Sequence, residues 1–218
     1  MGMKKREKFV RGEIYHICNK SIANFSILQN PKNCQRFIGT FDYYNNKYVV
    51  KSYSYFLSKT PNYQILNLLI PKSFSYVKFL AYCLMPDHYH LLVKITTENL
   101  LSKYLGNIEN SFSRYFNIKS NRKGPLWQSR FRAIRIKNNE QLLHITRYIH
   151  LNPTTSNLVE KPEDWIYSSY RDYIRNSKIL DEILFEISIH DCKTYQEFVN
   201  SRIDYQKKLK YIKNLLLE

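Results

Sequence analysis

Acidic residues are scarce in this chain. Of its 218 residues, 18 are Asp or Glu and 34 are Lys or Arg, which gives a formal net charge of +16 and a sequence pI near 9.6. A chain with so large a positive excess attracts polyanions. We therefore expect nucleic acid as the partner, with an anionic membrane surface as the second alternative.

Glycine, proline and cysteine are also few. Five Gly and seven Pro exclude collagen-like and linker-dominated chains. The four cysteines, Cys18, Cys34, Cys83 and Cys192, form no CxxC pair, which argues against a disulfide framework and a thiolate zinc site. No apolar run is long enough to cross a bilayer, and no apolar segment follows the basic start. We expect a soluble, cytoplasmic protein that has no membrane partner.

The hydrophobic content indicates a folded chain with a sizeable core. Hydrophobic residues make up 44% of the sequence and aromatic residues 15%, too many for a disordered chain. The length suits one large domain or one domain with an appendage. We predict a domain over residues 1–174 and a helical extension over 175–218, which includes a basic amphipathic end at 205–213.

The hydrophobic pattern predicts an α+β fold. We expect a strand at 13–19, a helix from Pro31 and an extended piece at 51–57. Two strands follow at 76–84 and 88–95, joined by a tight turn, and then a helix capped by Thr97. The last elements are an edge strand at 131–136 and a helix that starts after Asn138 or Asn139 and ends at Asn152 and Pro153. This order is typical of a ferredoxin-like (RRM-like) antiparallel sheet packed with helices.

His88 and His90 are the sharpest local feature. Residues i and i+2 of a strand project from the same face, so both imidazoles can bind one divalent cation. Imidazole is a general metal donor, so the pair does not name the metal. The alternative is that two histidines share a half-buried strand by chance.

A metal site that acts on phosphate also needs a nucleophile, and Tyr148 stands out by its context. It lies near the end of the last predicted helix, and Asn152 follows four residues later on the same helical face, where its amide oxygen could reach a cation held by the histidines. The alternative is that Tyr148 belongs to the core and that Asn152 caps the helix before Pro153.

Basic and aromatic residues alternate between 111 and 135. Cationic groups neutralise phosphates, and exposed aromatic faces stack unpaired bases. The alternative is an ordinary solvated surface with Trp127 in the core. The residues are Arg114, Tyr115, Asn117, Lys119, Arg122, Lys123, Trp127, Arg130, Arg132 and Arg135.

Six segments in this order resemble the single-tyrosine HUH transposases, in particular the REP-associated tyrosine transposase branch found in bacteria. They are Gly12–Lys20, Tyr82–Leu92, Ser113–Asn117, Gly124–Phe131, Arg147–Pro153 and Trp165–Tyr170. The resemblance extends from about Gly12 to Tyr173, and several ordered motifs make it specific.

The resemblance implies a metal-dependent transposase that cleaves and rejoins single-stranded DNA containing hairpins or imperfect palindromes. His88 and His90 would bind Mg²⁺ or Mn²⁺, Tyr148 would form a 5′-phosphotyrosine link, and Asn152 would be a third metal ligand. Asn19 and Lys20 occupy the positions of an Asn-Arg pair associated with reading a short guide sequence. Lys in place of Arg cannot make the bidentate contact. The expected DNA-binding residues are Asn19, Lys20, Arg114, Tyr115, Asn117, Trp127, Arg130 and Arg132.

Two other functions remain open from the sequence. One is a protein that binds hairpin DNA or RNA on the same scaffold without cutting it. The other is a rolling-circle-type relaxase, which would share the His-x-His pair. Related enzymes place the tyrosine helix in the same or the partner subunit, so both a monomer and a homodimer are compatible with the sequence.

Overall fold

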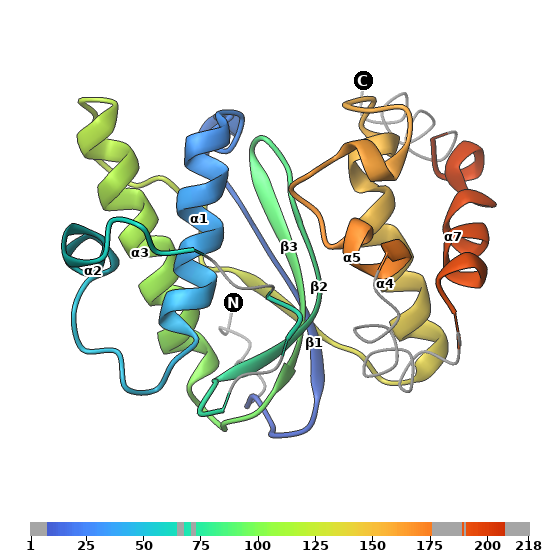
Figure 1. The fold of residues 1–218 in the computed structure, drawn as a ribbon, viewed down its shortest axis with the longest axis horizontal. Coiled ribbons are helices and arrows are strands. Elements are labelled where there is room, and N and C mark those ends of the chain that lie inside the picture. Colours follow the sequence, from blue (N-terminus) through green and yellow to red (C-terminus); the bar gives the residue numbers. More distant parts are fainter. Residues whose placement is uncertain (1–7, 65–67, 71–72, 176–188, 190, 208–218) are drawn as a thin grey trace, which may run out of the picture.

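An antiparallel sheet lies at the centre of the molecule, between two layers of helices (Figure 1). The computed structural model describes residues 8–64, 68–70, 73–175, 189 and 191–207. The strands are β1 (Ile14–Lys20), β2 (Val77–Leu84), β3 (His88–Ile95) and β4 (Arg132–Arg135), in the order β2-β3-β1-β4. All neighbours pair antiparallel. The predicted ferredoxin-like α+β fold is confirmed.

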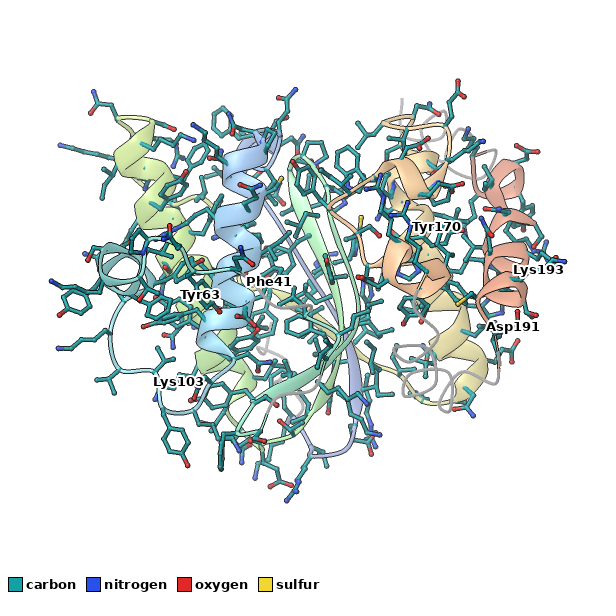
Figure 2. All side chains as sticks on the ribbon, in the orientation of Figure 1. Phe41, Tyr63, Lys103, Tyr170, Asp191 and Lys193 are labelled. Atoms are coloured by element: carbon teal, nitrogen blue, oxygen red, sulfur yellow. The ribbon has the colours of Figure 1, made fainter. Side chains whose placement is uncertain are left out.

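One face of the sheet is covered by α1 (Pro31–Tyr44) and α3 (Leu101–Lys119), with α2 (Tyr53–Lys59) beside them. Asn30 caps α1, since its side chain accepts a hydrogen bond from the Lys32 amide, and Pro31 occupies the first turn. Buried rings from both helices meet strand residues here: Phe37 lies 4.7 Å from Phe112 and 5.4 Å from Tyr89 between ring centroids. Phe41, labelled in Figure 2, belongs to the same aromatic core.

The opposite face carries α4 (Asn139–Thr155), α5 (Tyr170–Arg175) and α7 (Cys192–Asn200). Short 3₁₀ turns are found at Ile22–Asn24 and Pro162–Asp164. Asn138 caps α4 by accepting a hydrogen bond from the Gln141 amide at 2.8 Å. None of the helices in the described ranges is long and apolar enough to span a membrane.

Three local predictions differ from the structure. The segment predicted as extended around 51–57 forms α2, because Ser52 accepts a hydrogen bond from the Tyr55 amide and so caps a helix. Thr97 does not cap α3: its hydroxyl donates to the Ser75 carbonyl, and α3 begins at Leu101. Pro153 does not end α4, which continues to Thr155, because a proline in the last turn removes a single helical hydrogen bond.

The predicted helical extension is described only in part. Residues 176–188, 190 and 208–218 lie outside the described residues, and so does most of the basic end at 205–213. The predicted boundary at residue 174 falls inside α5, and α7 packs against both α5 and α4.

His150 is the polar centre of this helical layer. It is fully buried on α4, where its Nδ1 and the Tyr195 hydroxyl of α7 are 2.6 Å apart, and its Nε2 and the Ser169 hydroxyl are 2.8 Å apart. Its ring also packs edge-on against Tyr173, with the centroids 4.7 Å apart. Burial lowers the pKa of His150 to about 3, so the imidazole is neutral at pH 7.

Replacement of His150 is expected to change the acid sensitivity of the protein. His150 takes up a proton near pH 6.5 in the unfolded chain but only near pH 3 in the folded chain. The contribution of neutral His150 to the free energy of unfolding is therefore complete above pH 6.5 and is lost as the pH falls toward 3. Between pH 7 and pH 5, wild type should lose about 2 kcal/mol more unfolding free energy than His150→Gln. Urea unfolding at both pH values measures the difference, with His144→Gln, at an exposed position of α4, as the control. Equal losses in wild type and His150→Gln would contradict this role of His150.

Candidate functional site

The strand geometry places His88 and His90 on the face of the sheet toward α4. Their rings are nearly perpendicular, with centroids 5.0 Å apart. Tyr89 between them points to the opposite face, where it is fully buried and its hydroxyl donates to Glu109 Oε1 at 2.7 Å. The pairing of β1 with β3 sets Cys18 opposite His90 and Lys20 opposite His88. The predicted alternation of β3 is therefore present in the structure.

In each of the two histidines the Nδ1 atom has a hydrogen-bonding partner behind the cavity, which we call its outer partner. Asp87 Oδ1 lies 2.6 Å from Nδ1 of His88, and His16 Nε2 lies 2.9 Å from Nδ1 of His90. Such partners hold the ring orientation and fix which nitrogen remains for a ligand, as outer residues do around metal-binding histidines. The remaining ring nitrogen is Nε2 in both histidines.

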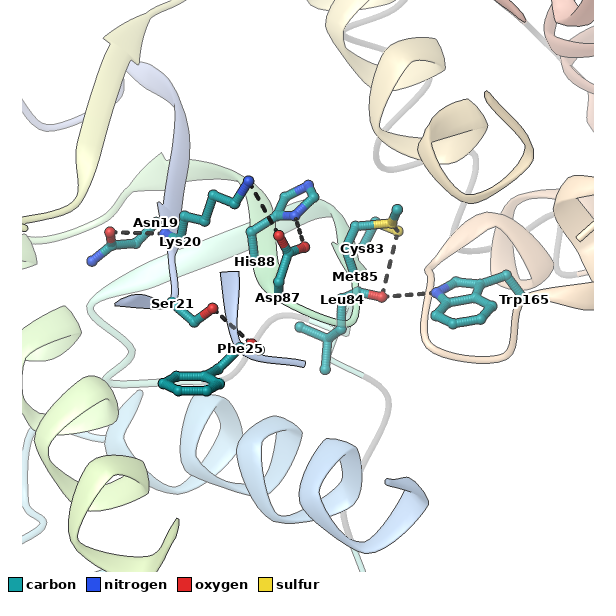
Figure 3. Close-up of polar contacts among 10 residues, drawn as sticks. All are labelled: Asn19, Lys20, Ser21, Phe25, Cys83, Leu84, Met85, Asp87, His88 and Trp165. Atoms are coloured by element: carbon teal, nitrogen blue, oxygen red, sulfur yellow. Dashed lines mark hydrogen bonds and ion pairs between the residues drawn. The ribbon is translucent and has the colours of Figure 1, made fainter. Parts of the chain in front are cut away.

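Asp87 is also an ion-pair partner of Lys20. The Lys20 ammonium lies 3.2 Å from Asp87 Oδ2, so Lys20 and His88 converge on one carboxylate (Figure 3). Partial burial raises the pKa of Asp87, but hydrogen bonds and charge from His88 and Lys20 outweigh it and hold the pKa at about 2. Asp87 is thus a carboxylate at neutral pH. Burial lowers the pKa of His16 to about 4, so His16 is a neutral outer partner.

Tyr148 reaches the histidines from α4. Its ring stands edge-on to His90 with the centroids 5.5 Å apart, and edge-on to His16 at 6.3 Å. The residue is 41% exposed, so the phenol is accessible from solvent. Burial of its inner part raises the pKa of Tyr148, and the nearby Asn152 amide opposes that rise. Asn152 itself is buried one turn further along α4.

An open cavity of about 290 Å³ lies in front of these side chains. Its cationic members are Lys20 and Arg132, and Arg132 is exposed on the edge strand β4 opposite Cys18. No Asp or Glu is among the lining residues, and the nearby Asp87 is paired with Lys20. The cavity can therefore accept an anion such as a phosphate. Its lining residues are Cys18, Asn19, Lys20, His88, His90, Gln128, Ser129, Arg132 and Tyr148.

Asn19 lines this cavity, but its amide is used within the protein. Asn19 is 7% exposed; its Nδ2 donates to Glu109 Oε1 at 2.8 Å and to the Ser129 carbonyl at 3.0 Å, and its Oδ1 accepts from the Lys20 amide. The expected base contacts of Asn19 and Lys20 stay predictions. In the structure both side chains are held by protein partners.

Several expected DNA-binding residues lie away from the cavity, on or beside α3. Trp127 is half-buried and packs against Phe37 and Tyr89, each at 5.5 Å between ring centroids, so the core alternative describes its position. Tyr115 and Asn117 are half-buried, and the Asn117 amide donates to the Gly124 carbonyl at 2.9 Å. Arg114 and Arg130 are exposed and remain accessible to a phosphate backbone.

Sequence reasoning missed the outer partners His16, Asp87 and Glu109. His16 was visible as a strand residue two positions before Cys18, and Asp87 directly precedes the His-x-His pair. Glu109 holds Asn19, which belongs to the expected site, and Tyr89, which lies between the two histidines, because its carboxylate accepts from both. The roles of His16 and Glu109 depend on the pairing of distant segments, whereas Asp87 contacts its direct neighbour His88.

The donor chemistry fits a divalent cation that takes part of its ligands from elsewhere. Among the described residues no group of three or more His, Cys, Asp and Glu side chains could hold a metal. His88 and His90 supply the imidazole donors at the cavity. Asn152 is buried and is not among the residues that line the cavity, so its role as a third ligand stays a prediction. Oxygen atoms of a bound phosphate would have to complete such a set, and mixed nitrogen and oxygen ligands suit Mn²⁺ better than Mg²⁺.

Removal of Lys20 should weaken the acidity of Asp87. In Lys20→Met the carboxylate has no ammonium partner, so its pKa should rise from about 2 toward the ordinary 3.8. A ¹³C NMR titration of the Asp87 carboxyl measures this, with Lys103→Met, on the exposed side of α3, as the control. An unchanged midpoint in Lys20→Met would show that the pair does not form in solution.

Comparisons with known proteins agree with this geometry. Residues 70–152 match a family model described as IS200-like transposase. A Haemophilus influenzae protein described as a REP-associated tyrosine transposase is 29% identical over 100 residues, which cover 41% of this chain and 57% of that protein. The chain thus matches little more than half the length of this relative.

A solved structure of a REP-associated tyrosine transposase bound to a REP hairpin has the same fold. The TM-score is 0.56 at 17% identity, over 81% of this chain and 87% of that chain. The family match contains His88, His90 and Tyr148, and it ends at Asn152. Motifs, family model, relative and fold agree that this chain resembles the REP-associated branch of the IS200-like tyrosine transposases.

Proposed function

We propose that this protein is a tyrosine transposase that cleaves and rejoins single-stranded, hairpin-containing DNA with the help of a divalent metal ion. The observation that carries the proposal is the position of Tyr148: its ring lies 5.5 Å from that of His90, at a cavity that also exposes His88 and two cations. A candidate nucleophile, two imidazoles and two cationic groups thus lie at one cavity, which supports the proposal.

The comparisons support the substrate class. The relative of similar fold is bound to a REP hairpin, and the related Haemophilus influenzae protein is described as REP-associated. A hairpin-forming single strand carries unpaired bases and phosphates at its flanks. The net charge of +16 favours any such polyanion.

The chemical step is a displacement at phosphorus. The phenol oxygen of Tyr148 bonds to the phosphorus of the scissile phosphodiester, and the bond to the 3′ oxygen breaks. The phenol loses its proton, and the leaving oxygen gains one to become a 3′-hydroxyl. A free 3′-hydroxyl reverses the step and joins a strand, so no nucleotide cofactor is required.

Protein groups hold the reactants for this step. Lys20 and Arg132 draw a phosphate into the cavity, and Asp87 and His16 orient the rings of His88 and His90. The Asn152 amide near the phenol favours its ionised form. A cation held by His88, His90 and Asn152 would neutralise charge on the phosphate and lower the pKa of Tyr148, which burial alone raises.

A second candidate function is binding of hairpin DNA or RNA without cleavage. One observation favours it: burial raises the pKa of Tyr148, which makes the phenol a weaker nucleophile at neutral pH. Both candidates require the positive cavity, so binding alone does not separate them. The two candidates differ in whether a covalent link forms between protein and DNA.

Tyr148→Phe should abolish the covalent link between protein and DNA. The variant keeps the ring and its packing but lacks the attacking oxygen, so hairpin affinity should remain at the wild-type level. Denaturing gel electrophoresis of labelled hairpin oligonucleotides with Mn²⁺ measures adducts, and Tyr205→Phe, at an exposed tyrosine beyond α7, is the matched control. Adducts of normal yield in Tyr148→Phe would rule out its role, and their absence in wild type would favour the non-cleaving protein.

The outer partner of His88 should set the metal requirement. Chelation by EDTA should stop adduct formation, and added Mn²⁺ should restore it. In Asp87→Asn the Mn²⁺ concentration for half-maximal adduct formation should rise by about 10-fold to 100-fold, because a carboxylate that orients a ligating imidazole strengthens metal binding. Glu140→Gln, an exposed acid on α4, is the control. Adduct formation in the presence of EDTA would contradict the metal dependence.

A further inference from the structure

A second hollow lies on the other helical layer, away from Tyr148. This aromatic groove is an open cavity of about 520 Å³ between the end of α1, the segment after it, and α2. Tyr63, labelled in Figure 2, marks its position on the side of α1 and α2, across the sheet from α4. It is lined by Asp42, Tyr43, Asn46, Tyr48, Val49, Val50, Lys51, Tyr55, Phe56, Lys59 and Tyr63. None of these residues lines the cavity at Tyr148.

Aromatic rings form both the floor and the rim of the groove. The floor is held by ring packing, with Tyr43 and Phe56 centroids 4.8 Å apart and Phe56 and Tyr63 centroids 5.0 Å apart. On the rim, Tyr48 is 70% exposed and Tyr55 is 51% exposed. A rigid aromatic floor with exposed rings at its edge provides flat faces on which unpaired bases can stack.

The charge of this part of the chain has one sign. Residues 43–86 contain no Asp or Glu and five lysines. Two of these, Lys51 and Lys59, line the groove, and the Lys51 ammonium lies 5.8 Å from the Tyr55 ring centroid. The one acid in the lining, Asp42, is buried, and its carboxylate accepts a hydrogen bond from Tyr63. Among the lining residues, exposed rings and lysines therefore occur together without a competing exposed carboxylate.

We infer that the aromatic groove binds an unpaired segment of single-stranded DNA, with bases against Tyr48 and Tyr55 and phosphates at Lys51 and Lys59. Duplex DNA is a poorer match, because its base faces are already stacked inside the helix. An acidic protein surface would pair with the lysines but leave the rings uncovered. That the nucleic acid is DNA rests on the proposed function; the recognition of a single strand rests on the groove.

A second contact of this kind would increase the affinity for long substrates. A hairpin engaged at Tyr148 would be bound more tightly when an attached single strand also reaches the groove, because the second binding event is then intramolecular. The groove would thus select DNA by the length of its unpaired flank.

The first test uses a fluorescein-labelled oligothymidine of about 12 nucleotides, which forms no hairpin and falls within the usual span of single-strand sites. Fluorescence anisotropy with the full chain should show a Tyr48→Ala/Tyr55→Ala double variant binding about tenfold or more weakly than wild type. Tyr205→Ala, at an equally exposed tyrosine, should bind as wild type. Unchanged affinity in a double variant of normal thermal stability would overturn the inference.

Salt dependence tests the lysines separately. In Lys51→Gln/Lys59→Gln the slope of log affinity against log salt should decrease by about 1.4, because each phosphate of a single strand that a lysine neutralises adds about 0.7 to that slope. A slope equal to that of wild type would contradict the proposed binding of phosphates by these lysines. Sedimentation tests the alternative that the groove joins two copies of the chain. If wild type self-associates, the Tyr48→Ala/Tyr55→Ala variant does not, and that variant keeps its oligothymidine binding, the groove joins two copies of the chain and the inference is wrong.

Failure of the proposed function would look different. Tyr148→Phe should bind oligothymidine as wild type does, and the groove variants should still form adducts with a short hairpin that has no long flank. Absence of adducts in wild type with intact oligothymidine binding would remove the transposase and leave the groove. If wild type forms normal adducts and the groove variants bind oligothymidine as wild type does, the transposase proposal stands and the groove inference is wrong.

Discussion

The antiparallel pairing of β1 with β3 is the constraint on which the candidate site depends. A shift of one residue would turn every side chain to the other face of the sheet, so that Tyr89 would replace the histidines beneath α4. The observed register instead brings His16 to His90 and Lys20 to Asp87. The same register sends Tyr89 and Asn19 to Glu109 on the opposite face. The pairing of β1 with β3 thus positions both the histidine rings at the cavity and the residues that hydrogen-bond to them.

The second requirement is the orientation of α4, which depends on the layer behind it. His150 and Arg147 point from α4 toward α7: His150 contacts the Tyr195 hydroxyl, and the Arg147 guanidinium lies 4.2 Å from the Phe198 ring centroid. These contacts leave Tyr148 on the side that meets the sheet. Arg147 and His150 therefore determine where the Tyr148 phenol points, although neither of them lines the cavity.

Much of this arrangement follows from local sequence, and the exceptions have physical reasons. Alternation placed His88 and His90 on one face, and helical spacing placed Asn152 beneath Tyr148, because both depend on backbone periodicity alone. The roles of His16 and Glu109 depend on contacts across 74 and 90 residues, respectively, which no local pattern encodes. The helix α2 was missed because the cap at Ser52 outweighs the strand propensity of the aromatic residues that follow. Trp127 packs against Phe37 and Tyr89, as the core alternative describes, and its role in DNA binding stays a prediction.

Tyr148 meets the histidines of its own chain. A site divided between two subunits exists only in the fraction of molecules that have associated, so its concentration falls with the square of the protein concentration when association is weak. Here α4 follows β4 in the same chain, and the encounter of phenol and imidazoles is a step of folding. In this arrangement the number of candidate sites is proportional to the number of folded chains and does not depend on their association.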